Sequence, residues 1–276
     1  MDYKRVLTVQ DISCFGQCSL TVALPILSAA GHETVILPSA VLSTHTGGFS
    51  GFTFCDLTQE IPKITKHWQS ENIKFDAIYT GYLGSTTQIN YVKEMFKTLG
   101  KDKFIKIVDP AMADNGKLYT GFDSEFVNEM KSLVFTADII LPNITEACFL
   151  TDTEYKENYD EHYIQVLVKK LKDNGAKAII MTGVSYDDNT TGVLVVEGDN
   201  TRYYRHRKIS RGSHGTGDVY ASAFVGAYLK NNDVYMSAKI AADYTLACIE
   251  NTVDDDYHRY GVKFEPVLPL YIDSLK

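Results

Sequence analysis

The chain has 276 residues, of which 45% are hydrophobic and 22% charged, with 19 glycines and 7 prolines. This composition excludes disordered, collagen-like and low-complexity proteins, and the length suits one large α/β domain over residues 1–276. With 27 basic and 35 acidic residues the net charge is −8. We therefore expect neither nucleic acid nor an anionic membrane as a partner, since both require a positive field.

The sequence carries little sign of export or membrane insertion. The apolar run after Arg5 stops at Gln10, which is too short for the core of a signal peptide. No segment approaches the length of about 18 apolar residues that a membrane-spanning helix needs. The five cysteines are odd in number and scattered, which disfavours a disulfide framework. We expect a cytoplasmic protein with buried free thiols.

Short runs rich in β-branched residues alternate along the chain with segments of helical periodicity. This alternation is typical of a parallel sheet whose strands are connected by helices. The expected strands are Val6–Gln10, Thr34–Leu37, Phe75–Tyr79, Phe104–Val108, Ala137–Leu141 and Ala178–Met181. The expected helices are Thr86–Leu99 between Ser85 and Gly100, Asp160–Asn174 before Gly175, Tyr235–Glu250 and Glu265–Ser274.

One hairpin interrupts this alternation. Thr191–Glu197 and Arg202–Ile209 read as two strands around the turn Gly198-Asp199-Asn200. The hairpin leads into a glycine-rich segment that precedes a helix of small residues. We therefore predict a doubly wound, mostly parallel α/β sheet flanked by helices, with a β-hairpin before a glycine loop.

Polar residues follow most of the expected strands. In a doubly wound sheet, ligands bind in the crevice outside the carboxyl ends of the strands. Polar residues at so many strand ends indicate a binding crevice. These residues are Asp11, Tyr79 to Gly81, Asp109, Asn143 and Thr182-Gly183.

The strongest chemical signal is the loop Gly215-Thr216-Gly217-Asp218. Glycines before a helix allow backbone N–H groups to converge on an anion at the positive end of the helix. A carboxylate in that position can also accept a proton from an attacking hydroxyl group. The alternative is a glycine turn in which Asp218 merely caps the helix.

Carboxylates and an amide in two further segments fit a nucleotide site. Asp109 and Asp114 can hold Mg²⁺ directly or through water, although Asp114 also fits a surface Asp-Asn-Gly turn. Asn143 and Glu146 have the spacing of a capping box, which is compatible with a further role at an ion or phosphate.

Basic residues and a histidine near these segments have two interpretations each. His45 either contacts substrate or is structural. The basic residues of the second hairpin strand either attract nucleotide phosphates or lie on a solvated face. They are Arg202, Arg205, Arg207, Lys208 and Arg211.

Five motifs together resemble the ribokinase superfamily, and within it the pyridoxal/pyridoxamine (vitamin B6) kinases. Gly215–Asp218 (GTGD) is similar to the anion hole and catalytic aspartate of that family. Val108–Tyr119 (VDPAMADNGKLY) is similar to its DPVMGDNGKLY segment, and Leu141–Ala147 (LPNITEA) to its PNxxEA segment. Ser43–Gly48 (STHTGG) and Tyr79–Leu83 (YTGYL) are similar to its substrate motifs SNHTGY and TGY.

The resemblance implies an ATP- and Mg²⁺-dependent kinase that phosphorylates the 5′-hydroxymethyl group of pyridoxamine, pyridoxal or pyridoxine, and it suggests a monovalent cation as an additional cofactor. It implies a homodimer. The implied roles are Asp218 as catalytic residue; Gly215, Thr216 and Gly217 as anion hole; Asn143, Glu146, Thr182 and Gly183 at ATP; Asp109, Asp114 and Glu146 at the metal; and Asp11, His45, Thr46, Tyr82 and His214 at the substrate.

Two departures from the pyridoxal-kinase pattern leave alternatives open. Asp11 stands where that family has serine, and it either pairs with substrate or caps a turn. His214 is similar to the HGTGC loop of hydroxymethylpyrimidine kinases, although those have cysteine where Asp218 stands. A hydroxymethylpyrimidine kinase is therefore the second hypothesis. A non-catalytic ligand-binding relative has less support, because the carboxylates are intact, and a sugar kinase ranks below the B6 and hydroxymethylpyrimidine kinases, because Asp11 to Leu20 contains a single glycine.

Overall fold

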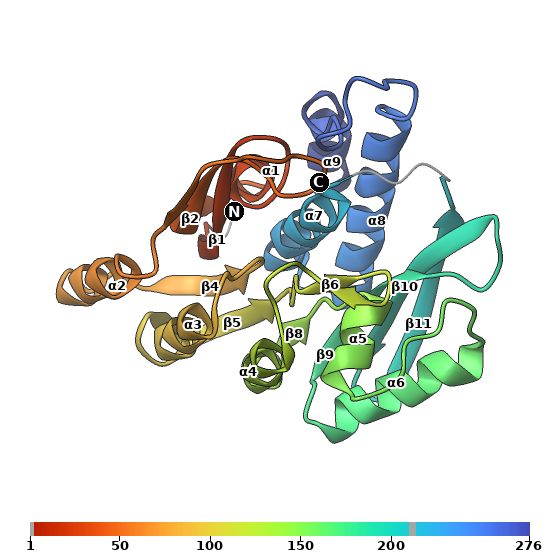
Figure 1. Cartoon of the computed structure of the whole chain (residues 1–276), viewed down its shortest axis with the longest axis horizontal. Helices are drawn as coiled ribbons and strands as arrows, with labels where there is room; N and C mark the ends of the chain where they lie inside the picture. Colours follow the sequence, from red (N-terminus) through yellow and green to blue (C-terminus); the bar gives the residue numbers. More distant parts are fainter. Residues whose placement is uncertain (1–2, 210–213) are drawn as a thin grey trace.

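The computed structural model describes residues 3–209 and 214–276, and it has alternating strands and helices in chain order (Figure 1). The strands are β1 (Arg5–Phe15), β2 (Glu33–Thr44), β3 (Phe54–Asp56), β4 (Phe75–Thr80), β5 (Gly100–Val108), β6 (Ala113–Asp114), β7 (Lys117–Leu118), β8 (Ile139–Ile140), β9 (Ala178–Val184), β10 (Thr190–Glu197) and β11 (Asn200–Arg207). The helices are α1 (Leu20–Ala29), α2 (Ile61–Ser70), α3 (Thr86–Thr98), α4 (Ser124–Val134), α5 (Ile144–Leu150), α6 (Glu161–Asp173), α7 (Thr216–Asn231), α8 (Val234–Glu250), the 3₁₀ turn Glu265–Val267 and α9 (Leu268–Ser274).

Within the described residues, nine strands form one sheet in the order β11-β10-β9-β8-β5-β4-β1-β2-β3. The neighbours from β9 to β2 pair in parallel, whereas β10, β11 and β3 are antiparallel additions at the two edges. The chain moves from β1 to β2 on one side and then continues with β4 on the other side of β1. Such a reversal is where ligands bind in doubly wound sheets. The predicted fold class is confirmed.

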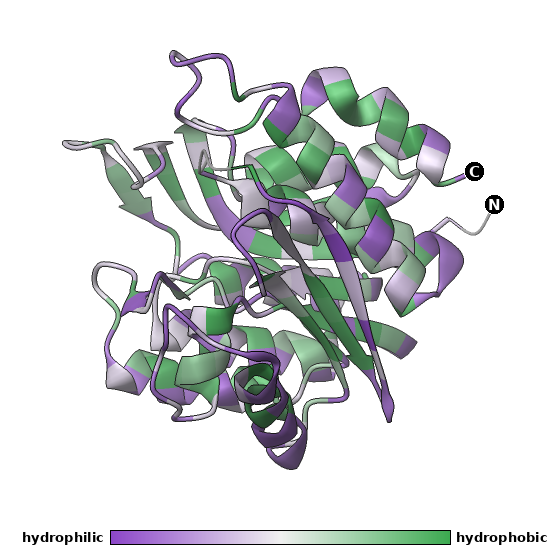
Figure 2. Ribbon diagram, turned by 90° about the vertical axis from the view of Figure 1, so that its right-hand side faces the viewer, coloured by the Kyte–Doolittle hydropathy of each residue, from purple (hydrophilic) through white to green (hydrophobic). Residues whose placement is uncertain are grey.

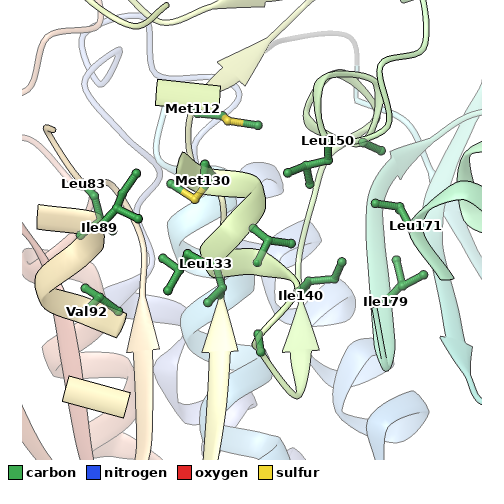
Figure 3. Packing of buried hydrophobic residues seen from close by; sticks show 14 of the residues in the cluster. Leu83, Ile89, Val92, Met112, Met130, Leu133, Ile140, Leu150, Leu171 and Ile179 are labelled. Atoms are coloured by element: carbon green, nitrogen blue, oxygen red, sulfur yellow. The ribbon is translucent and has the colours of Figure 1, made fainter. Parts of the chain in front are cut away.

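Both faces of the sheet are covered by helices, so its parallel strands are apolar on both sides. Adjacent residues of one strand therefore enter different cores: Ile139 lies in the core with α1, α7, α8 and α9, and Ile140 in the core with α2 to α6. Figure 3 shows side chains of the second core, among them Met130, Leu133 and Ile140. Figure 2 shows hydrophobic strands in the middle of the molecule and hydrophilic residues on the outer surfaces of the helices.

Several elements differ from the predictions at their ends. β1 does not stop at Gln10: it continues to Phe15 along β2, and its register shifts between Gln10 and Ile12. Asp11 therefore lies inside the strand, at the point where β1 has parted from β4. Gly100 does not cap α3; Leu99 does, and Gly100 begins β5.

Sequence reasoning did not specify four helices, namely α1, α2, α4 and α5. The pattern of α1 is weak because the helix is apolar on most sides and contains Pro25. α5 is only seven residues long, so it shows less than two full turns of periodicity.

No helix in the described part of the chain is long and apolar enough to span a membrane. All five cysteines are free, but the prediction that they are buried is wrong for Cys14 and Cys55, which are exposed; Cys148 and Cys248 are buried.

Candidate active site

A cavity of about 430 Å³ opens where the carboxyl ends of β5, β8 and β9 meet the first turn of α7. It brings together most of the residues that the sequence singled out. Its walls include Asp109, Asp114, Asn143, Glu146, Thr182, Gly183, His214, Gly215, Thr216, Gly217 and Asp218. The segment before His214 (residues 210–213, with Arg211) lies outside the described residues.

The glycine loop begins helix α7 in a conformation that glycine favours. Gly215 is the N-cap residue, with φ of 74° in the left-handed region. A Cβ atom at Gly215 would lie 2.0 Å from the backbone oxygen of Gln17, so both the dihedral angle and the space require glycine. The backbone N–H groups of the first turn lie outside the helix's own ladder of hydrogen bonds, and this turn borders the cavity. The alternative in which Asp218 caps the helix is wrong, because Asp218 belongs to the first turn.

Asp218 is a half-buried carboxylate in the first turn of α7. Burial raises the pKa of Asp218 to about 7, against a lowering effect of the Ser19 backbone in the loop before α1, and the nearby Asp11 carboxylate raises it further. A carboxylate with a pKa near neutrality is well matched to accepting a proton at physiological pH.

Glu146 and Asn143 form the predicted capping box at the start of α5. The Asn143 side chain accepts from the Glu146 N–H at 2.9 Å, and Glu146 Oε2 accepts from the Asn143 N–H at 2.9 Å. Glu146 Oε1 also accepts from the N–H of Met112 at 3.0 Å. Burial nevertheless raises the pKa of Glu146 to about 7. The capping role is therefore real, and it leaves the carboxylate at the cavity wall.

Asp109 and Asp114 reach the same cavity from different local structures. Asp109 follows β5, and its Oδ1 accepts from the N–H of Ala111 at 3.1 Å. Burial, then Glu146 and Asp218, raise the pKa of Asp109 well above its usual range. Asp114 is exposed and closes the tight turn between β6 and β7, its Oδ1 accepting from the Asn115 N–H at 2.8 Å. The expected surface turn thus exists and also borders the cavity.

This donor set fits a divalent cation that arrives with a phosphorylated ligand. No three described His, Cys, Asp or Glu side chains are placed to bind a metal ion on their own. Mg²⁺ commonly uses one or two carboxylates together with water and substrate phosphates. The carboxylates of Asp109, Glu146 and Asp218 all line the cavity, beside the amides of α7. A cation there would offset the repulsion between these negative charges.

Asp11 and Tyr82 do not line this cavity, but the Asp11 carboxylate lies near Asp218. Asp11 is 6% exposed and accepts a hydrogen bond from Ser13 Oγ at 3.3 Å. Burial raises the pKa of Asp11, and the Asp11 carboxylate contributes to a raised pKa at Tyr82, after burial. The Tyr82 ring stacks on Phe122 with centroids 5.5 Å apart. Asp11 is therefore close enough to raise the pKa values of both Tyr82 and Asp218, and its pairing with substrate stays a prediction.

The loop after β2 places His45 beside His214. Their ring centroids are 5.4 Å apart, and Thr46 next to His45 is exposed. His45 Nε2 lies 3.0 Å from the carbonyl oxygen of Tyr260, and burial lowers the pKa of His45. Because a carbonyl only accepts, the neutral ring donates from Nε2 and leaves Nδ1 as an acceptor.

The basic residues of β11 do not gather at the cavity. Arg202 stacks over the ring of Tyr235 at 4.0 Å, and Arg207 pairs with Glu250. The solvated-face interpretation is therefore confirmed for these two residues. His206 does line the cavity.

Three parts of the site were not predicted as such. Tyr119 lines the cavity, and burial together with Glu146 and Asp109 raises its pKa; only its place in the VDPAMADNGKLY motif hinted at this position. Ser19, whose backbone affects the pKa of Asp218, had no sequence signal. A further part of the cavity wall comes from β10 and α8, whose apolar patterns are those of ordinary buried elements; it consists of Thr191, Gly192, Val193, Ala242, Thr245, Leu246 and Ile249.

Comparisons with known proteins agree with this geometry. The model of the phosphomethylpyrimidine kinase family matches residues 29–262. A solved structure from Bacteroides thetaiotaomicron, described as a phosphomethylpyrimidine kinase and crystallised with pyridoxal, is 37% identical; the match covers 98% of this chain and 96% of that one, with a TM-score of 0.91. Pyridoxal kinase from Lactobacillus plantarum is 28% identical over 99% of this chain and 98% of its own, with a TM-score of 0.91.

A more distant match shows the fold alone. Pyridoxal kinase from Leishmania donovani, in complex with ADP and pyridoxamine, is 20% identical over 99% of this chain and 95% of its own, with a TM-score of 0.82. The chain therefore belongs to the phosphomethylpyrimidine kinase family and has the fold of the ribokinase-like pyridoxal kinases.

Proposed function

We propose that this protein is an ATP- and Mg²⁺-dependent kinase that phosphorylates the 5′-hydroxymethyl group of pyridoxamine, pyridoxal or pyridoxine. The observation that carries the proposal is the position of Asp218. It stands at the start of α7, lines the acidic cavity, and lies near the Asp11 carboxylate, which in turn lies near Tyr82. A base that adjoins both a phosphate site and an alcohol site is the arrangement that phosphoryl transfer requires.

The cavity supplies a nucleotide site. Its apolar wall from β10 and α8 suits an adenine base, and Asn143, Glu146, Thr182 and Gly183 also line the cavity. The amides of Gly215 to Gly217 at the N-terminus of α7 suit the terminal phosphate, where the helix dipole also favours negative charge. The Leishmania enzyme of the same fold binds ADP, which supports this assignment.

Mg²⁺ would be held by Asp109, Asp114 and Glu146, directly or through water, together with the phosphates, and would neutralise charge on the transferring group. Asp218 accepts the proton of the attacking hydroxyl group. Gly215, Thr216 and Gly217 donate backbone hydrogen bonds toward the phosphoryl oxygens and stabilise their charge. A requirement for a monovalent cation is also a prediction from the resemblance.

The substrate ring would lie against Asp11, His45, Thr46, Tyr82 and His214. The neutral His45 offers Nδ1 as an acceptor, and Tyr82 offers an aromatic face. The pyridoxal bound to the Bacteroides relative supports a B6 substrate. A homodimer, a cytoplasmic location and a single domain over residues 1–276 remain predictions.

The second candidate is a hydroxymethylpyrimidine kinase. It is favoured by the description of the matching family model and by His214 in front of the glycine loop. Asp218 at the catalytic position favours the B6 kinase.

A coupled ADP-release assay with pyridoxamine, pyridoxal, pyridoxine, hydroxymethylpyrimidine and ribose separates the candidates. We expect the highest kcat/KM with a B6 vitamer. A higher value with hydroxymethylpyrimidine would transfer the assignment to the second candidate, and no ADP release with any acceptor would leave a non-catalytic relative.

Asp11→Ser should penalise pyridoxamine more than pyridoxal. The Asp11 carboxylate can accept a hydrogen bond from the protonated 4′-amine of pyridoxamine, which pyridoxal lacks, and such a charge-assisted bond contributes about 1.5–3 kcal/mol. The measurement is kcat/KM for both vitamers in wild type and variant. Equal losses for the two vitamers, or none, would make Asp11 a structural residue.

A further inference from the structure

The loop between α8 and the 3₁₀ turn (residues 251–264) reaches back to the substrate side of the proposed site. Its residue Tyr260 accepts two hydrogen bonds at one carbonyl oxygen, from His45 Nε2 at 3.0 Å and from the backbone N–H of Gln17 at 3.0 Å. His45 follows β2 and Gln17 comes shortly after β1. A single oxygen atom therefore ties the carboxyl ends of both strands to the C-terminal part of the chain.

The ring of Tyr260 packs against other aromatic rings. Its centroid lies 4.6 Å from that of Phe15 and 4.3 Å from that of His258. The Phe15 ring meets Phe49 edge-on at 6.1 Å, and the Phe49 ring meets His45 edge-on at 5.0 Å. Ring packing therefore connects Tyr260 to His45 by a second route, in addition to the hydrogen bond.

The surroundings of His45 leave its ring little room to turn. The residue is 7% exposed, and a Cβ atom at Gly16 would lie 2.3 Å from His45 Cδ2. The loop that carries Tyr260 is equally close to the chain, because a Cβ atom at Gly261 would lie 2.5 Å from Gln17 Cβ. Close packing thus fixes the position of the His45 ring, and the hydrogen bond to Tyr260 selects which ring nitrogen carries the proton.

The proton position matters because it decides what His45 offers to a ligand. With the proton on Nε2, the Nδ1 atom has a free lone pair and accepts a hydrogen bond. The other tautomer would set a lone pair of Nε2 against the carbonyl oxygen of Tyr260, and it would offer a donor at Nδ1. The partner of one ring nitrogen thereby determines the chemistry of the other.

We propose that Tyr260 is a positioning residue for the vitamer: its carbonyl oxygen sets the tautomer of His45, and its ring keeps that carbonyl in place by packing on Phe15. The Nδ1 atom of His45 then accepts a hydrogen bond from the ring hydroxyl group that all three vitamers carry. The proposal rests on the proposed function, in which His45 is a substrate contact.

Replacement of the Tyr260 ring should affect the vitamer and not the nucleotide. We expect Tyr260→Ala to raise KM for pyridoxal by about five-fold or more, because one hydrogen bond to the vitamer is weakened. KM for ATP should stay within about two-fold of wild type. Tyr260→Phe keeps the ring and should recover the wild-type KM for pyridoxal.

Tyr257→Ala is the matched control, because Tyr257 lies in the same loop and is 92% exposed. It should keep both wild-type KM values. If Tyr260→Ala does not fold, Tyr260→Leu fills more of the ring volume and should give the same split between the two KM values. A wild-type KM for pyridoxal in the folded variant, or equal rises in both KM values, would overturn the proposal.

Proton–nitrogen NMR spectra of the histidine rings test the tautomer without any turnover. The signals of His45 are identified by their loss in His45→Gln. Above the pH range in which histidine titrates, wild type and Tyr260→Phe should show His45 protonated at Nε2, and Tyr260→Ala should show a mixture of both tautomers. Retention of the Nε2–H tautomer alone in Tyr260→Ala, or a wild-type ring protonated at Nδ1, would overturn the proposal.

A double-mutant cycle shows whether Tyr260 acts through His45. In the His45→Gln protein, Tyr260→Ala should raise KM for pyridoxal by less than about two-fold more, because the ring that it positions is gone. Multiplicative rises would overturn the coupling. A wild type that turns over no vitamer refutes the kinase assignment, and the tautomer comparison then decides the Tyr260 proposal alone.

Discussion

Replacing Asp218 with asparagine should lower kcat by about 10²-fold or more, which is the usual contribution of a positioned general base. Asparagine keeps the size of the side chain, but it cannot take the proton of the substrate hydroxyl. Thermal melting serves as the control and should stay near that of wild type or rise, because a buried carboxylate is removed. A well-folded variant within a few-fold of wild-type kcat would contradict the assignment.

The pH dependence gives the same residue a second signature. Burial raises the pKa of Asp218 to about 7, so below that pH the group is protonated in the folded protein and cannot act as a base. Wild-type kcat/KM should therefore fall as the pH drops through about 7. Burial also raises the pKa of Glu146 to about 7, so either group could cause this fall in activity. The pH profile of the residual activity of Asp218→Asn distinguishes the two groups. If the fall below about pH 7 disappears in this variant, it belongs to Asp218.

Gly215→Ala is expected to disable the anion loop and to destabilise the fold. A Cβ there would approach the Gln17 carbonyl oxygen to 2.0 Å, and φ is 74°. The clashing atom belongs to the backbone and not to a flexible side chain, so Gln17 or α7 must move. We expect this movement to lower the free energy of unfolding by about 2–5 kcal/mol. A displaced α7 start would lower kcat/KM for ATP by at least about 10²-fold, because a donor aimed at a transition-state charge is worth that much.

Gly175→Ala is the matched control for this variant. Gly175 has φ of 102° at the end of α6, and nothing lies within 4 Å of a Cβ there. It should lose stability through backbone strain alone, with activity unchanged. A Gly215→Ala protein as stable and active as the Gly175→Ala protein would contradict the tight packing of the loop on Gln17.

The sequence was most informative where local chemistry and fold position coincide. The strands at the sheet centre were predicted because β-branched runs are buried on both faces, as at Ile139 and Ile140. The cavity wall was predicted because polar residues follow those strands, and Asn143 and Glu146 have a capping spacing that the structure confirms.

The features that the sequence did not predict depend on tertiary placement. Ser19 is an ordinary residue in the sequence, and only the folded chain gives it a positive φ of 52° before α1 and an effect on the pKa of Asp218. Asp11 was expected just beyond a strand, but β2 continues to pair with β1 and keeps Asp11 inside it. The apolar residues of α8 at the cavity could not be told from core residues by pattern, because both are buried.

The most direct test of the proposed function is a crystal structure with a non-hydrolysable ATP analogue, Mg²⁺ and pyridoxamine. We predict the terminal phosphate at the amides of Gly215 to Gly217 and the 5′-hydroxyl group within hydrogen-bonding distance of Asp218, with the ring facing Asp11 and Tyr82. A terminal phosphate that points away from Gly215 to Gly217, or a pyridoxamine bound elsewhere, would contradict it.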